Sequence, residues 1–171
     1  KVSSCAHLLH QMHPAVVKEL GLAIDTAARD IPLIALGRDG RHLKLTHDKV
    51  TGLNGATVSA ADTAAYREMM RDLRKFASVL APLTAGKPPR FKERDWEDNK
   101  TLLKLGLSLR LMGKRDMQEF LRIALLNIAD LVEDSLEDKL LQAAISMDSV
   151  WGAHMAPRSP GTVLSYLYRM T

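Results

Sequence analysis

The stretch IPLIALGRDGRHLKLT, residues 31–46, decides the fold of this chain. Two β-prone runs, 31–36 and 42–46, flank an Asp-Gly pair at 39–40, and glycine there tolerates the positive φ of a tight turn. In the second run leucines alternate with polar residues, which predicts one buried and one solvated face. The stretch therefore predicts a β-hairpin. Two strands alone are marginal in water, so any larger sheet has to be completed by residues elsewhere.

Helical patterns dominate the rest of the chain. Ser59 is a predicted N-cap with Asp62 three residues later, in the manner of a capping box, and apolar residues recur behind it at helical spacing. Upstream, residues 4–22 predict a short helical region that ends at Gly21. The remaining helices are predicted at 95–112, 117–125, 128–134, 137–147 and 162–170, with loops at 84–95 and 151–161.

These elements predict a single α+β domain over residues 1–171. It is mostly helical, with a small antiparallel hairpin or sheet near 31–46 and a helical region at 59–171. The chain has 171 residues, 46% hydrophobic and 26% charged, which suits one globular domain and argues against disorder. The acidic pairs Glu133-Asp134 and Glu137-Asp138 are expected to be solvated helix ends, since acidic side chains suit a first helical turn.

Charge and hydropathy limit which partners and which cellular location the sequence predicts. A net charge of +4 is mild, and the basic loop at 87–94, with Trp96 behind it, is partly neutralised by its own acids. We therefore expect a solvated loop and no nucleic-acid partner. No apolar run approaches the roughly 20 residues of a membrane-spanning helix, and no signal peptide is visible. We expect a cytoplasmic location, with a peripheral membrane contact left open for a longer parent protein.

Metal and nucleophile patterns are weak. Cys5, His7, His10 and His13 are zinc-compatible side chains, but Pro14 breaks the helix behind them and no second ligand cluster follows. A polar helix face is the preferred interpretation, and no metal site is predicted.

Nucleophile and base pairs are no more specific. Cys5 with those histidines, or Ser149 or Ser159 with His154, lacks a G-x-S-x-G elbow. We predict no catalytic residue. No G-x-G-x-x-G or phosphate-binding P-loop motif occurs either, so no cofactor-binding residue is predicted in this chain.

Four segments, taken in order, carry a resemblance. They are Ser4-Cys-Ala-His-Leu-Leu with PAVVKELGL at 14–22, the Asp39-Gly40 hairpin followed by Ser59, Asp62 and Tyr66, the runs at 130–136 and 140–144, and GAHMAPRSPGT at 152–162. Together they resemble the phytoene dehydrogenase-like branch of the FAD-dependent amine oxidase superfamily, which includes the pyridine nucleotide-disulphide oxidoreductase domain-containing proteins. The resemblance covers nearly the whole chain.

The resemblance implies the substrate-binding (cap) portion of an FAD-dependent oxidoreductase. In that family the glycine-rich flavin loop would lie upstream of Lys1 and the second flavin-binding section downstream of Thr171, so this chain is expected to be an internal segment that holds no FAD and is inactive alone. Whether it is an enzyme in its own right stays open. The alternative is a stand-alone helical protein-interaction module without enzymatic activity.

The expected ligand is an apolar small-molecule substrate. Its walls are expected from Met69, Met70, Leu103, Leu107, Leu111, Met112 and Met117, although the same residues suit an ordinary helical core. The candidate substrate-binding residues are Pro160, Gly161 and Thr162, because proline and glycine fix the backbone where a helix begins. The strands at 31–36 and 42–46 are expected to have open edges, which predicts a homodimer formed through them.

Overall fold

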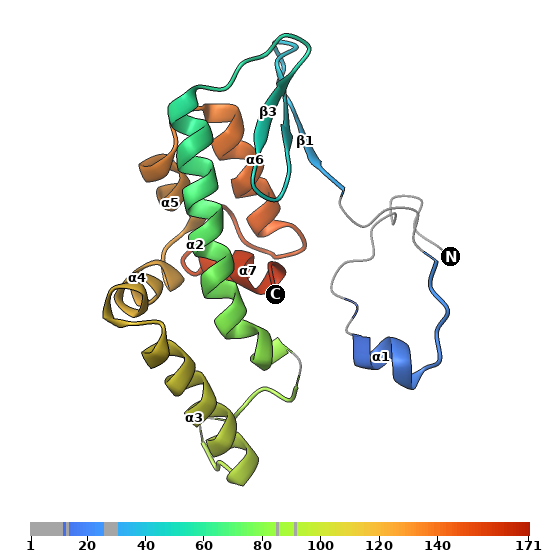
Figure 1. The fold of residues 1–171 in the computed structure, drawn as a ribbon, viewed down its shortest axis with the longest axis vertical. Coiled ribbons are helices and arrows are strands. Elements are labelled where there is room, and N and C mark those ends of the chain that lie inside the picture. The colour runs from blue at the N-terminus through green and yellow to red at the C-terminus, as the bar shows by residue number, and fades with distance from the viewer. Residues whose placement is uncertain (1–11, 13, 26–30, 85, 91) are drawn as a thin grey trace.

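The computed structural model describes residues 12, 14–25, 31–84, 86–90 and 92–171. Within these ranges the chain is α+β and mostly helical, as predicted (Figure 1). The elements are α1 (Pro14–Glu19), β1 (Leu33–Leu36), β2 (His42–Leu45), β3 (Val50–Leu53), α2 (Ala60–Thr84), α3 (Trp96–Leu111), α4 (Lys114–Ala124), α5 (Ile128–Ser135), α6 (Lys139–Val150) and α7 (Thr162–Arg169). The predicted cluster of Cys5, His7, His10 and His13 lies outside the described residues.

The predicted hairpin is confirmed. The Gly37 N–H donates to the Arg41 carbonyl at 2.9 Å and the Gly40 N–H to the Gly37 carbonyl at 3.2 Å. Gly40 has φ +82°, a left-handed conformation that glycine adopts readily in a tight turn. The sequence thus correctly placed the turn that joins β1 to β2.

A third strand, which the sequence analysis did not predict, completes the sheet. β3 pairs antiparallel with β2, so the strand order is β1-β2-β3 and β2 is paired on both sides. The expectation that the strand at 42–46 has an open edge is therefore wrong. The sequence did not predict β3 because the strand contains Gly52, and glycine is depleted in strands. Here it is required, since a Cβ at position 52 would lie 1.7 Å from the Ala56 carbonyl oxygen.

The long helix α2 is the centre of the core. Ser59 caps it as predicted, its Oγ accepting from the Asp62 N–H at 2.9 Å. The Asp62 carboxylate is buried, and it accepts from the Glu137 N–H at 2.7 Å. Phe76 meets Phe120 of α4 edge to face, with ring centroids 5.7 Å apart. One face of α2 supplies seven buried residues of the main cluster: Tyr66, Met69, Met70, Leu73, Phe76, Ala77 and Leu80.

The helix α3 begins at a capping box and stands partly clear of the core. Asp95 and Asp98 exchange side-chain to backbone hydrogen bonds, and Arg90 of the preceding basic loop pairs with both carboxylates. The predicted end of this helix before Gly113, which has φ +90°, is confirmed. Among the described residues, no helix combines the length and apolarity needed to cross a membrane.

The sheet is fastened to the helices by apolar contacts and by one long-range ion pair. Four residues of its inner face, Ala35, Leu43, Leu45 and Val50, belong to the main core cluster. Arg41 at the hairpin turn donates to both carboxylate oxygens of Asp138, at 2.8 and 3.2 Å. The Asp138 side chain is only 8% exposed, so the prediction of a solvated acid at 138 is wrong. It is nevertheless a helix end, because Asp138 is the N-cap of α6.

Candidate binding pocket

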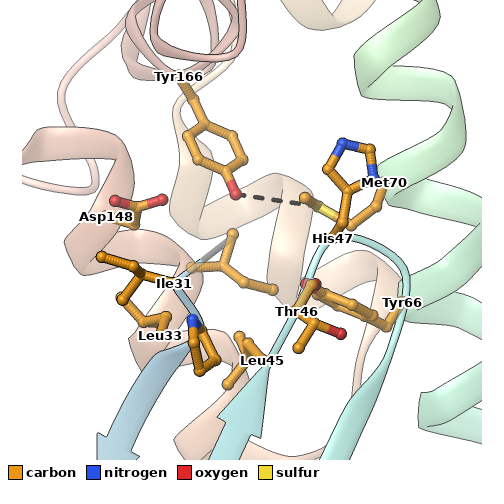
Figure 2. Close-up of a pocket in the computed structure, with 11 residues that line it drawn as sticks. Ile31, Leu33, Leu45, Thr46, His47, Tyr66, Met70, Asp148 and Tyr166 are labelled. Atoms are coloured by element: carbon orange, nitrogen blue, oxygen red, sulfur yellow. Dashed lines mark hydrogen bonds between the residues drawn. The ribbon is translucent and has the colours of Figure 1, made fainter. Parts of the chain in front are cut away.

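A pocket of about 260 Å³ lies between the sheet and the helical layer (Figure 2). Its walls come from the chain leading into β1, from β2 and its following turn, and from α2, α6 and α7. The lining residues are Ile31, Pro32, Leu33, Leu45, Thr46, His47, Tyr66, Met70, Ile145, Asp148 and Tyr166. Segments far apart in the sequence therefore form one mainly apolar surface.

Two buried tyrosines contribute polar groups to the pocket, whose lining also includes Thr46, His47 and Asp148. The Tyr66 hydroxyl donates to the Thr46 carbonyl at 2.8 Å and so also ties α2 to the sheet. The Tyr166 hydroxyl points toward the Met70 sulfur, 3.9 Å away (Figure 2). Burial raises the pKa of Tyr66 to about 12 and raises the pKa of Tyr166 as well. Both phenols are therefore neutral at physiological pH.

The acidic group of the pocket is already paired. Arg169 of α7 donates to the Asp148 carboxylate at 2.8 Å, and Arg169 also donates to the Trp151 carbonyl at 3.1 Å. The negative charge at Asp148 is thus offset by a neighbouring cation that belongs to the fold. Apart from Thr46, His47 and the paired Asp148, the lining consists of neutral phenols, a thioether and aliphatic side chains, which suits a mainly apolar ligand with a few hydrogen-bonding groups.

The three predicted substrate-binding residues lie elsewhere, at the start of α7. Pro160 is exposed, and Gly161 has φ +77° with its N–H donating to the Leu125 carbonyl at 3.3 Å. Thr162 is fully buried, and its hydroxyl oxygen accepts from the Ile128 N–H at 2.8 Å. None of the three lines the pocket between the sheet and the helices. Gly161 thus joins the start of α7 to the end of α4, and Thr162 joins it to the start of α5.

The expected apolar wall residues are divided between core and surface. Met69 and Met70 are buried, and of the seven only Met70 lines this pocket. Leu103, Leu107 and Leu111, spaced four apart on α3, are 74%, 56% and 76% exposed. Helix α3 therefore presents an apolar stripe to solvent in the described part of the chain.

The serines considered as nucleophiles have local partners. Ser149 is buried and its hydroxyl donates to the Ser146 carbonyl at 2.7 Å. The Ser159 hydroxyl oxygen accepts from the Ala156 N–H at 3.1 Å, within the loop before α7. Each hydroxyl thus serves the local backbone. Within the described residues no group of three or more His, Cys, Asp or Glu side chains has the arrangement of a metal site.

Sequence reasoning missed most of the pocket. Tyr66 was noted only as part of a motif, and Asp148 and Tyr166 were not singled out. The available signal was a tyrosine on the apolar side of a helix, since Tyr166 lies between buried Val163 and Leu167. A buried phenol needs a partner or a cavity for its hydroxyl, which marks such a position as a candidate site.

The protein is expected to lose stability as the pH rises above about 10. The pKa of Tyr66 in the folded chain is about 12, whereas an unfolded tyrosine ionises near pH 10, so between these values the unfolded chain releases a proton that the folded chain keeps. Urea unfolding at a series of alkaline pH values should show this fall, and Tyr66→Phe should make it shallower. An equal pH dependence in both proteins would contradict the role assigned to Tyr66.

No family model, curated protein or solved structure matches this chain. The pocket is therefore the structural observation on which a functional proposal can rest. The lining of the pocket indicates a mainly apolar ligand, because most of its walls are apolar and its two phenols are neutral.

Proposed function

We propose that this chain is the substrate-binding portion of an FAD-dependent oxidoreductase resembling the phytoene dehydrogenase-like enzymes. The observation that carries the proposal is the pocket beside Tyr66, Met70 and Tyr166, which offers apolar walls and neutral phenols. Oxidoreductases of this type leave the redox chemistry to the flavin, and the protein contributes binding, orientation and exclusion of water. A mainly apolar pocket fits that division of labour.

The chain itself does not fit FAD. A dinucleotide pyrophosphate is held by a glycine-rich turn at a helix N-terminus, and no G-x-G-x-x-G or P-loop motif occurs in these 171 residues. The proposal therefore gives this chain only the binding and orientation of the substrate. The flavin is assigned to polypeptide outside the chain, and no reaction step is assigned to residues within it.

The size of the pocket limits what it holds. Pockets for drug-sized ligands measure roughly 300 to 1,000 Å³, and this one measures about 260 Å³. It suits one end of an extended apolar molecule better than a whole large substrate. Pro160 and Gly161 remain proposed substrate contacts, since Pro160 is exposed where α7 begins. Thr162 contributes by holding that turn in place.

Binding of diphenylhexatriene tests whether the pocket takes an apolar ligand. This polyene fluoresces strongly only in an apolar environment shielded from water. Chain 1–171 is expected to bind it saturably. Thr46→Trp should weaken binding at least about tenfold, or about 1.4 kcal/mol, because Thr46 lines the pocket and its exposed side chain can be enlarged without disturbing the core. Thr51→Trp is the matched control, since Thr51 is an exposed strand residue outside the pocket lining. Equal affinities in both variants would refute the pocket assignment.

The flavin part of the proposal has its own test. The gene's continuous reading frame around this chain is expressed, and the purified product is examined for flavin absorbance. A yellow protein with stoichiometric FAD is expected, together with a glycine-rich strand-turn-helix motif upstream of Lys1. A colourless product without that motif would favour the stand-alone interaction module, for which the exposed leucine stripe of α3 is the supporting observation.

A further inference from the structure

Within the described residues, the outer edge of β1 pairs with no other strand and carries apolar side chains. Leu33–Leu36 contains no charged residue and no proline. Ile34 is 44% and Leu36 71% exposed, so apolar side chains lie along this edge. Natural edge strands are usually blunted by lysine, proline or a covering segment, because an open apolar edge is a template for another strand. β1 forms the edge of the sheet opposite β3 (Figure 1).

The hairpin geometry fixes which backbone groups of β1 point away from β2. The Gly37 N–H donates to the Arg41 carbonyl, which makes 37 and 41 a hydrogen-bonded pair. Such pairs alternate along an antiparallel ladder, so Ala35 with Leu43 is the next one. Ile34 and Leu36 therefore turn their N–H and C=O groups away from β2, toward the open edge.

The other candidate surfaces suit a second copy less well. The edge of β3 at Gly52 is approached closely by the Ala56 backbone. The leucine stripe of α3 has Lys100, Lys104 and Arg110 each at a helical spacing of three from one of its leucines. Two copies of that stripe would bring like charges together, whereas β1 carries no charge.

We propose that two copies of this chain pair β1 to β1, antiparallel, about a two-fold axis at Ala35. In this register Ile34 faces Leu36 of the second copy as a hydrogen-bonded pair, and the symmetry repeats the pair. Ala35 faces Ala35 as a non-hydrogen-bonded pair, where the Cα atoms are only about 4.5 Å apart and small side chains fit. The two sheets become one continuous sheet with apolar neighbours across the junction.

The hydrogen-bonded ladder between the two copies can extend over only a few residues. In the same register Pro32 faces Arg38 of the second copy, and proline has no N–H to donate, so the ladder stops there. The contact is short and the dimer is weak and concentration-dependent. Because Ile31, Pro32 and Leu33 also line the pocket, the second copy's turn at 37–40 lies beside the pocket rim. The inference rests on the strand edge alone and is independent of the proposed oxidoreductase.

Sedimentation equilibrium of chain 1–171 from low to high micromolar concentration tests the inference. A monomer–dimer equilibrium is expected, and Leu36→Lys should raise its dissociation constant at least about tenfold. Leu103→Lys is the matched control, since Leu103 is 74% exposed on α3 against 71% for Leu36 on the strand. The control should dimerise like the wild type. Thermal unfolding of both variants establishes that each is folded.

Amide hydrogen exchange tests the register. The N–H groups of Ile34 and Leu36 should become protected as concentration rises, while that of Ala35, already bonded to β2, should be protected at all concentrations. A monomer throughout the range overturns the inference and leaves the edge to a strand of another polypeptide. A dimer lost in Leu103→Lys but kept in Leu36→Lys also overturns it, in favour of α3.

Discussion

Replacing Leu73 with alanine is expected to lower the free energy of unfolding by about 3 kcal/mol. Leu73 is 1% exposed and lies in the middle of α2, the helix that packs against α3, α5 and α7. The truncation removes buried methyl groups and leaves a cavity that helices on several sides cannot all move to fill. Urea unfolding followed by circular dichroism measures the loss.

The control for this prediction is Leu103→Ala. Leu103 is 74% exposed, so the same chemical change there removes little buried surface and should alter stability by no more than about 0.5 kcal/mol. Similar losses in the two variants would mean that α2 is not the centre of the core. A loss confined to Leu73→Ala would support the packing described here.

The second large effect is expected from Asp138→Ala, which should cost about 2 to 3 kcal/mol. Asp138 Oδ1 accepts from the N–H groups of Leu140 and Leu141, at 2.9 and 3.0 Å, and caps α6. The same carboxylate holds Arg41 of the hairpin turn at 2.8 Å. The substitution therefore removes a helix cap and the ion pair that fastens the sheet to the helices.

Asp138→Asn separates the two contributions. Asparagine caps a helix about as well as aspartate but carries no charge for Arg41, so a smaller loss of about 1 kcal/mol is expected. Although burial opposes the charge, the Leu141 N–H and the Arg41 guanidinium hold the pKa of Asp138 below its usual value. A folded pKa below the unfolded one stabilises the protein above about pH 4, and that stability is lost as the pH falls through the folded value.

The difference between wild type and Asp138→Asn should consequently shrink in acid. Urea unfolding at neutral pH and again below about pH 3 measures it. Amide exchange in 33–45 adds a local readout, since the hairpin should open more readily in both variants. If Asn and Ala cost the same at neutral pH, the cap at α6 contributes little and the ion pair carries the whole effect.

The local elements were within reach of sequence reasoning. The Asp39-Gly40 pair predicted the hairpin. Ser59 predicted the start of α2, and Gly113 predicted the end of α3. Each prediction was confirmed. Turns and caps are decided by backbone conformations and hydrogen bonds that span only a few residues, so their signals are local too. β3 was missed because the reason for its glycine, the approach of Ala56, is a contact with the following loop.

Thus the sequence by itself determined the class of the fold, the hairpin and the order of the helices, through periodicity and capping residues. Only the tertiary structure decided that Tyr66, Asp148 and Tyr166 share a pocket and that Asp138 is buried against Arg41 rather than solvated. Arg41 and Asp138 are 97 residues apart along the chain. Whether a polar side chain contacts water, a partner or a cavity depends on which elements pack together. A local sequence pattern does not show which residues far apart along the chain will be in contact.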